Sequence, residues 1–523
     1  MHACQSVVTY EQRNPAGTQL YKVISENLNS FLVERSEEGR NLPKFIVREF
    51  ESYLRCGIYA HGFGRVQCGS CQHEKIVPYS CKGRGFCPSC GARRMAEAAI
   101  HLVDDLLPVV PVRQFVVTFP VQLRMWMARS KSLCAKVCEK VCAELTAHLQ
   151  HAAGIEKGLS GLVVFIQRFG SAANLNIHFH VIALDGVYEK KSTGRLKFYA
   201  AQAPTNDTIQ NLVGRISKKI NNLLIKKGYL EKVEDMVLVG NTDDIFSDSS
   251  RNSFEDIHLP AQAASVAHRI AFGPNAGQPI RRLKSHTSLW PSEQNFKSSS
   301  IACVTAGGYS VHAETAIKSH ERDRLEKLVR YMARPAISDE RVIIEGPQSI
   351  RVKLKSRWAD GTESLLFTPS EFLERLVALI PTPKFHTTRY YGVLASRSQH
   401  RRYLPDKPTP LIDTEHGADA QDSGPPLAGS ADKKQKPRKR KRISWAQLLK
   451  RTFKIDVLKC DKCGGRMKLV GVVFDQPTIS TTLRALGLPV RAPPIAPARS
   501  RHLLDCDNSS DWTGGDVDYG WPD

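Results

Sequence analysis

The chain has 523 residues, with 74 Lys and Arg against 52 Asp and Glu, a formal net charge of +22 at pH 7. That length allows several domains, and the charge favours a polyanionic partner, most simply nucleic acid. No stretch approaches the roughly 18 apolar residues of a membrane span, and the first residues lack signal-peptide features. We therefore expect a cytoplasmic protein with no membrane partner, whose 14 cysteines are metal ligands or buried thiols rather than disulfides.

In chain order, the first half combines helices and strands around a cysteine-rich stretch. Residues 1–55 read as mostly helical and residues 56–95 as rich in cysteine and glycine. A helix is expected over 96–112, a short β-branched strand over 114–120, and a long helix to about residue 152. The strand is expected to stop at its proline.

The second half begins with two strands and continues with helices and a hairpin. We expect antiparallel neighbours at 161–169 and 176–184, because only a short loop separates them. The further elements expected are helices at 208–227, 320–334 and 371–380 and a hairpin at 350–367.

The last part of the chain reads as a linker followed by a small module. Residues 405–442 are rich in Pro, Gly, Asp and Ser and end in a basic run at 433–442. This composition indicates a disordered linker, and the basic run is either a nonspecific DNA tether or a solvated linker. A small module is expected at 443–488 and a poorly ordered tail at 489–523.

Two Cys-x-x-Cys turns are the strongest local signal. Cys68 and Cys71 form the first turn, and Cys87 and Cys90 form the second after fifteen intervening residues. Each turn presents two thiolates to one ion, so the two together predict a closed, tetrahedral and structural zinc site. Such a site supplies folding energy to a segment too small for its own core.

Other residues near these turns suggest phosphate contacts and a second ion site. Arg93 and Arg94 belong to a group of basic residues around the cysteines that suits phosphate binding. A second ion site could use residues that the two turns leave over, namely Cys56 and Cys81 with His61 or His73.

A third Cys-x-x-Cys turn, Cys460 to Cys463, lacks an evident second pair. The candidates downstream of it are His502 and Cys506. A possible second zinc site at Cys460 and Cys463 therefore has three alternatives: a half site, a site that has been lost, or a site completed elsewhere.

His178 and His180 flank Phe179 in an apolar run. Residues two apart on a strand point to the same face, so the two imidazoles converge and form most of a metal site with open positions. The alternative is a strand with two solvent-facing or core-satisfied histidines.

The helix expected at 320–334 carries a tyrosine on a basic face. Arg324, Lys327 and Tyr331 share that face, and Arg330 and Arg334 flank it. Cations beside a phenol favour its phenolate and can hold a phosphate for attack. The alternative is an amphipathic tyrosine at the edge of the core.

The order of these motifs resembles one family. The paired Cys-x-x-Cys turns are followed by GLVVFIQRFGSAANLNIHFHVIALDGVY (161–188), ERDRLEKLVRYMARPAISDERV (321–342), LIPTPKFHTTRYYGVLA (379–395) and WAQLLKRTFKIDVLKCDKCGGRMKLVG (445–471). Over about residues 20–490 the chain is similar to the rolling-circle transposases of the insertion-sequence ninety-one type, including the enzymes of common-region elements. The resemblance implies an α+β fold: a HUH (His-hydrophobic-His) endonuclease core at 113–404 behind an N-terminal zinc-binding domain at 1–112. We expect the core to be an antiparallel sheet with helices packed on one face.

The resemblance also implies a mechanism. His178 and His180 would bind Mg²⁺ or Mn²⁺, and Tyr331 would attack single-stranded DNA to give a 5′-phosphotyrosine and a free 3′-hydroxyl. Founding members carry Tyr-x-x-x-Tyr, whereas this chain has Lys327 at the first of those positions. It therefore resembles the single-tyrosine branch, and a transfer of two strands between two tyrosines of one subunit is in doubt.

Some assignments within this scheme stay open. Gln167, on the neighbouring strand, offers an amide oxygen as a third metal ligand, and Asp185 is the runner-up with a harder carboxylate. Tyr390 and Tyr391 are rival nucleophiles, but they follow a Pro-x-Pro turn rather than lying on a basic helix. Tyr331 is preferred because this chemistry depends on positioning.

Three other functions fit parts of the pattern. A HUH replication initiator or relaxase would share the chemistry, although the zinc domain and the C-terminal module argue against it. A catalytically decayed, zinc-containing DNA-binding protein is a non-enzymatic alternative, against which the intact His178, His180 and Tyr331 argue. A zinc hydrolase lacks the usual spacing for its third ligand.

Overall fold

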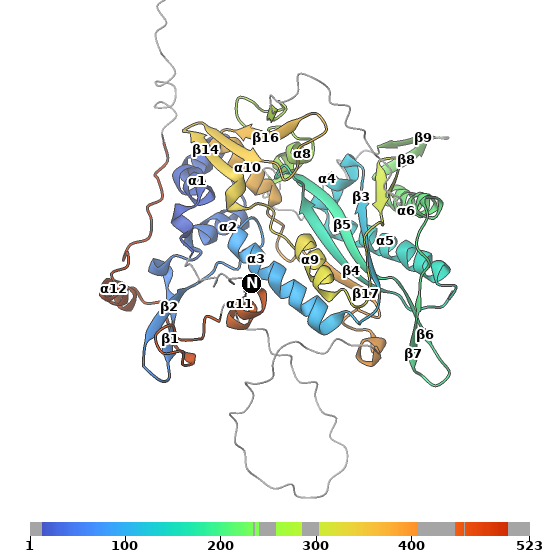
Figure 1. Ribbon diagram of the computed structural model, residues 1–523. Coiled ribbons are helices and arrows are strands. Elements are labelled where there is room, and N and C mark those ends of the chain that lie inside the picture. The colour runs from blue at the N-terminus through green and yellow to red at the C-terminus, as the bar shows by residue number, and fades with distance from the viewer. Residues whose placement is uncertain are drawn as a thin grey trace, which may run out of the picture.

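A computed structural model describes residues 13–233, 236–239, 258–284, 303–405, 445–453 and 456–499 of the chain (Figure 1). The expected basic run at 433–442 and the candidate ligands His502 and Cys506 lie outside the described residues. Within the described part, no helix is long and apolar enough to cross a lipid bilayer.

An antiparallel sheet forms the centre of the molecule and confirms the expected α+β class. In spatial order its strands are β11 (Cys303–Ala306), β12 (Tyr309–His312), β3 (Val112–Thr118), β5 (Leu175–Leu184), β4 (Gly161–Phe169) and β17 (Thr388–Gly392), with β13 (Ala316–Ile317) also pairing with β3. β5 therefore lies between β3 and β4, and the expected antiparallel pairing of β4 with β5 is confirmed.

Helices cover both faces of this sheet, whereas the sequence led us to expect them on one face (Figure 1). One face packs against α4 (Val121–Arg129), α5 (Lys131–Ala152) and α6 (Asn206–Lys226). The other face packs against α3 (Pro88–Ile100), its π-helical continuation His101–Leu106 and α9 (Arg322–Met332). The reason lies in the run from Val181 to Leu184, which is apolar at every position and buries both sides of β5.

A second core joins the N-terminal helices to a smaller sheet. Helices α1 (Gln19–Glu37), α2 (Lys44–Arg55), α8 (His258–Val266) and α10 (Pro369–Leu379) pack with the strands β10 (Arg281–Lys284), β16 (Thr362–Phe367), β15 (Ser349–Lys353) and β14 (Val342–Gly346). The predicted hairpin is thus β15–β16. Local capping fixes two helix starts: Thr18 caps α1, and Thr368 with Glu371 forms a capping box at α10.

The expected C-terminal module is not separate from the N-terminal domain. Strand β18 (Met467–Val473) pairs with β1 (Phe63–Cys68), and β2 (Glu74–Pro78) completes a three-stranded sheet. Helix α12 (Gln476–Ala485) packs beside it, and α11 (Trp445–Phe453) lies against α3. Two further hairpins, β6 (Gly186–Lys190) with β7 (Leu196–Ala200) and β8 (Leu230–Val233) with β9 (Met236–Val239), extend from the central sheet region.

Candidate functional site

The two histidines of β5 face α9 and meet at their ring nitrogens. Nε2 of His178 lies 3.1 Å from Nε2 of His180, and the ring planes are inclined at 65° to each other. His180 is only 4% exposed, whereas His178 is partly exposed. Two lone pairs directed at one point are what a shared ion requires.

Hydrogen bonds at the far side of each ring fix its orientation. Nδ1 of His178 donates to the carbonyl of Asn176 at 2.8 Å, which leaves Nε2 with its lone pair. Nε2 of Gln114, on β3, donates to Nδ1 of His180 at 2.8 Å. With the amide turned by 180°, its oxygen would accept an Nδ1 proton instead, and this is the state in which Nε2 of His180 is free to ligate. Burial lowers the pKa of His178 to about 4 and that of His180 to about 3. Both rings are therefore neutral at pH 7 and able to ligate.

Gln167 lies directly opposite His178 across β4 and β5. Its Nε2 donates to the carbonyl of Met332 at 3.2 Å, while its Oε1 is buried and has no hydrogen-bond partner among the described residues. A buried amide oxygen without a partner costs free energy unless something binds it. The three side chains therefore fit a divalent ion with two imidazole ligands and one oxygen ligand.

Asp185, the other candidate for the third ligand, lies just beyond β5 and is occupied. Its carboxylate accepts two hydrogen bonds from Arg113, at 2.9 and 2.8 Å, and both residues are buried. The structure therefore places Gln167, and not Asp185, beside the histidines.

Tyr331 lies on α9 next to the histidine pair. Its ring centroid is 6.0 Å from that of His180, with the planes at 88°, and its side chain is 43% exposed. The guanidinium of Arg334 lies 4.5 Å from the Tyr331 ring centroid, and the ammonium of Lys355 lies 4.1 Å from it. The phenol is thus open to solvent, beside two cations and beside the two imidazoles.

The basic face of α9 is only partly available for phosphate. Arg324 and Lys327 are exposed, and Arg324 pairs with Glu321 at 3.3 Å. Arg330 instead turns to Glu326, one helical turn back, and pairs with it at 2.6 Å. A Glu and an Arg four residues apart on a helix commonly do this.

The rival tyrosines of β17 lie away from the histidines. Tyr391 is on the opposite face of the sheet, where its hydroxyl lies 3.2 Å from Sγ of Cys138 and burial raises its pKa. Tyr390 pairs with Val163, four residues along β4 from Gln167, or about 13 Å at 3.3 Å per residue. Burial also raises the pKa of Tyr390.

Two contributors to this site were not anticipated from the sequence, namely Gln114 and Lys355. Gln114 is a buried amide directly before the apolar run Phe115–Val117 of β3, and a polar residue at such a position is a usable signal. Lys355 comes from the loop after β15 and reaches Tyr331 from the other core. No local pattern marks it, because the contact joins segments that only the tertiary fold brings together.

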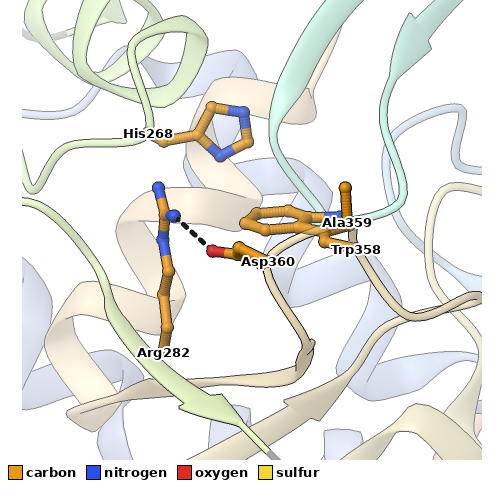
Figure 2. A pocket seen from close by; sticks show the side chains of 5 residues that line it. All are labelled: His268, Arg282, Trp358, Ala359 and Asp360. Carbon is orange, nitrogen blue, oxygen red and sulfur yellow. Dashed lines mark hydrogen bonds and ion pairs between the residues drawn. The ribbon is translucent and has the colours of Figure 1, made fainter. Parts of the chain in front are cut away.

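A shallow pocket of about 400 Å³ lies beside the loop that leads into β5 (Figure 2). In it, His268 and Arg282 converge on the indole of Trp358, with ring centroids 5.6 Å apart and the guanidinium 5.2 Å from the indole centroid. Burial lowers the pKa of His268 to about 4. The indole Nε1 donates to Ser171 in that loop at 3.4 Å, so the pocket is attached to the start of the histidine strand.

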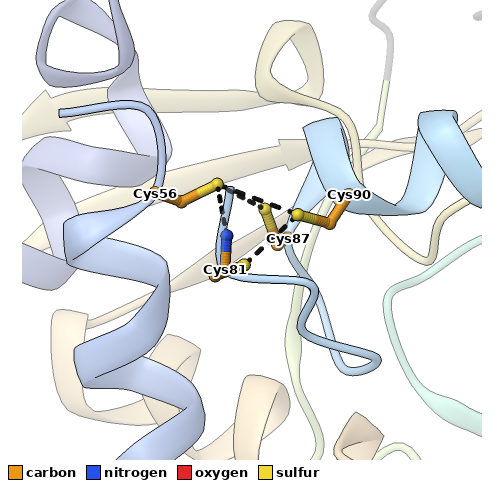
Figure 3. A group of neighbouring side chains, drawn as sticks. All are labelled: Cys56, Cys81, Cys87 and Cys90. Atoms are coloured by element: carbon orange, nitrogen blue, oxygen red, sulfur yellow. Dashed lines mark hydrogen bonds between the residues drawn. The ribbon is translucent and has the colours of Figure 1, made fainter. Parts of the chain in front are cut away.

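The cysteines form two clusters, and the prediction that Cys68, Cys71, Cys87 and Cys90 share one ion is wrong. Cys87 and Cys90 gather with two cysteines that the sequence left over, Cys56 and Cys81, and neither His61 nor His73 belongs to the cluster (Figure 3). In this cluster the Sγ atom of Cys56 lies 3.8 Å from those of Cys87 and Cys90. Four thiolates around a tetrahedral zinc lie about 3.8 Å apart.

The second cluster consists of Cys68, Cys71, Cys460 and Cys463. The physical reason for the two clusters is the hairpin of β1 and β2. Cys56 and Cys81 flank its base, whereas Cys68 and Cys71 lie at its tip, about 17–20 Å away for a strand of this length. The third Cys-x-x-Cys turn is thus completed by the first.

Arg93 and Arg94, expected at phosphates, make contacts within the protein. Arg93 pairs with Glu97 at 2.9 Å, and Arg94 donates to the carbonyls of Lys82 and Gly83. Arg94 thereby holds the loop that carries Cys81.

Comparisons with known proteins match two parts of the chain. A family model described as a transposase zinc-binding domain matches residues 24–119, and one described as a putative transposase matches residues 161–402. The transposase for insertion sequence element IS801 of Pseudomonas savastanoi pv. phaseolicola is 21% identical over 462 residues, 87% of this chain and 89% of that protein. No solved structure matches. The first match contains all four cysteines of Figure 3, which supports a structural zinc there.

Proposed function

Because the chain belongs to the IS91 family of transposases, we propose that it cuts and rejoins single-stranded DNA through a 5′-phosphotyrosine on Tyr331. One observation carries this proposal. The exposed phenol of Tyr331 lies beside the converging Nε2 atoms of His178 and His180, with the unpartnered Oε1 of Gln167 next to them. A solvent-exposed nucleophile and a ligand set on one side of a rigid sheet are parts that a phosphoryl transfer requires.

The ligand set favours a divalent cation with open positions. His178 and His180 would hold Mg²⁺ or Mn²⁺ with Gln167, and the bound ion would offset negative charge that develops on the phosphate oxygens. The protein itself supplies orientation: Asn176 and Gln114 fix the two rings, and the strand fixes their separation.

The proposed step exchanges one phosphodiester for another. The phenolic oxygen of Tyr331 attacks phosphorus, the bond from phosphorus to the 3′-oxygen breaks, and the phenolic proton leaves as the 3′-oxygen takes one up. The product is a 5′-phosphotyrosine with a free 3′-hydroxyl. Since the number of ester bonds is unchanged, the reverse reaction rejoins DNA without ATP. The guanidinium of Arg334 and the ammonium of Lys355 lie 4.5 and 4.1 Å from the Tyr331 ring centroid, where they can attract the phosphate that Tyr331 attacks.

The pocket of Figure 2 supports a single-stranded substrate. Trp358 offers an indole face in contact with Arg282, and single-stranded nucleic acids bind through such stacking and cationic surfaces. Trp358 belongs to the same β15–β16 connection as Lys355, which reaches Tyr331. We therefore propose that a base next to the scissile phosphate lies in this pocket.

A cleavage assay with labelled oligonucleotides tests this function. Strands from both DNA flanks of the gene are incubated with purified full-length protein and Mg²⁺ or Mn²⁺, then run on a denaturing gel. We expect a slow-migrating adduct that requires the cation, is lost in Tyr331→Phe and survives in the matched control Tyr390→Phe. An adduct that persists in Tyr331→Phe would show that another tyrosine is the nucleophile. No adduct from any strand would favour a DNA-binding protein without catalysis.

A further inference from the structure

Cys68 and Cys71 at the tip of the β1–β2 hairpin meet Cys460 and Cys463 from the C-terminal segment. Sγ of Cys68 lies 3.5 Å from Sγ of Cys463, although 395 residues separate them, and Sγ of Cys71 lies 3.6 Å from Sγ of Cys460. All four sulfur atoms lie within 4.8 Å of one another. These separations exceed a disulfide bond and are close to the roughly 3.8 Å expected around a tetrahedral zinc.

The backbone around the four sulfur atoms is also built for close approach. Gly464 has a φ of +72°, which favours glycine. A Cβ on Gly465 would lie 2.7 Å from Oγ of Ser70 and 3.1 Å from Sγ of Cys68. The N–H of Gly465 also points to Sγ of Cys463 at 3.4 Å. The two glycines thus allow one Cys-x-x-Cys turn to lie against the other.

Contacts around the cluster tie the same two segments together. Strand β18 pairs with β1 from Phe63 to Cys68, and the N–H of Gly69 donates to the carbonyl of Arg466 at 3.0 Å. Asp461 pairs with Lys75 at 3.1 Å. The cluster therefore lies where a hairpin of the N-terminal domain and a strand of the C-terminal segment form one sheet.

We infer that Cys68, Cys71, Cys460 and Cys463 bind a second structural zinc, which fastens residues 456–499 to the N-terminal zinc domain. The matched zinc-binding domain ends at residue 119 and contains only half of these ligands. The zinc domain of this chain is consequently completed by a segment from the far end of the sequence. A closed site of four thiolates is structural, because no position is left for a substrate.

Metal content tests the inference directly. Full-length protein purified in zinc-containing buffer is expected to hold two zinc ions per chain by elemental analysis. The double variant Cys460→Ser/Cys463→Ser should hold one, and Cys81→Ser should lose the other ion instead. Cys303→Ser is the matched control, because Cys303 is exposed and lies outside both clusters, and it should hold two. One zinc in the wild type, or two in the double variant, would overturn the inference.

Two further measurements keep the test decisive if the double variant does not fold. Cobalt titration of the metal-free wild type should give equal thiolate charge-transfer absorbance for the first and the second equivalent of cobalt. If the second equivalent gave no such absorbance, the chain would not contain a second site of four cysteines. In addition, a protease site inserted within 406–444 allows the chain to be cut. The C-terminal fragment should stay bound to the rest of the chain in zinc-containing buffer and should separate from it after the zinc is chelated. Separation of the two fragments in zinc-containing buffer would show that zinc does not hold them together.

Discussion

Replacing Gly91 with alanine should disturb the nucleophile through a contact outside the catalytic site. Gly91 follows Cys90 of the first cysteine cluster in α3, and a Cβ there would lie 2.6 Å from Cβ of Pro335 and 3.3 Å from its Cα. Pro335 comes three residues after the end of α9 and four after Tyr331. The proline ring cannot rotate away, so the helices must separate.

The size of the effect follows from that distance. Ordinary contact begins at 3.4 Å, so α3 or the end of α9 must shift by about 0.8 Å. Overpacking of this kind costs about 1–3 kcal/mol, while alanine gains about 1 kcal/mol over glycine within a helix. The net change for Gly91→Ala is a loss of up to about 2 kcal/mol of unfolding free energy. Since a misplacement of about 1 Å can cost roughly 100-fold in rate, cleavage should fall more than stability suggests.

Urea unfolding and the oligonucleotide cleavage assay measure the two effects. Gly214→Ala is the matched control, because Gly214 is an exposed glycine within α6 and a Cβ there meets nothing within 4 Å. The control should gain about 0.5–1 kcal/mol and keep its cleavage rate. If Gly91→Ala gains as much stability as Gly214→Ala, or cleaves as fast as wild type, the reasoning about this contact is wrong.

Three further predictions concern buried polar groups. Arg451→Met removes an ion-pair partner of Asp104, which is 2% exposed. Burial raises the pKa of Asp104, and Arg451 opposes that rise. The unfolding free energy should fall by about 3 kcal/mol at neutral pH, and by less in acid, where protonation removes the buried charge of Asp104. Gln114→Leu removes the amide beside Nδ1 of His180 and should weaken Mn²⁺ binding by about 10–100-fold in a titration. An unchanged Mn²⁺ affinity would show that Gln114 does not orient the His180 ring for metal binding. Burial raises the pKa of Glu374 from 4.5 to about 7. The folded state therefore holds this proton more tightly than the unfolded state, and the unfolding free energy falls as the pH rises from about 4.5 towards 7. Glu374→Gln should reduce this fall in unfolding free energy, and an unchanged pH dependence would contradict the raised pKa.

The arrangement of the candidate site was accessible from sequence because its parts obey local periodicities. Alternation along a strand places His178 and His180 on one face, and that face is where the structure has them converge. Helical spacing likewise puts Lys327 and Tyr331 on the exposed side of α9. The spacing alone could not show that the two faces meet, since β5 and α9 are joined only through the tertiary fold.

The grouping of the cysteines was not accessible in the same way. Two Cys-x-x-Cys turns close in sequence suggested one ion, but the stretch between them and before them forms a hairpin that carries one turn away from the other. The partner of Cys68 is 395 residues distant, and chain separation places no constraint on which thiols meet. The ion pair of Arg330, by contrast, could have been predicted from the sequence. Glu326 lies four residues earlier on the same helix, and it pairs with Arg330 in competition with a phosphate.

The position of Tyr331 depends on three contacts that lie outside the chemistry. Arg322, at the start of α9, donates to the carbonyls of Leu107 and Pro108 at 3.1 and 3.3 Å. Midway along α9, Glu326 accepts from Arg451 of the C-terminal segment at 3.0 Å. Just beyond the end of α9, Pro335 lies against Gly91, which follows Cys90 of the first cysteine cluster.

Each of these contacts comes from the zinc-bearing N-terminal domain, its connection to the central sheet, or the C-terminal segment. Folding free energy from metal bound at the two cysteine clusters would therefore also help to hold α9 over the histidine strand. A nucleophile on a helix held in this way loses little freedom when it attacks, which is the condition under which positioning accelerates a reaction. The zinc sites would therefore support cleavage without any metal-bound cysteine touching DNA at the scissile phosphate.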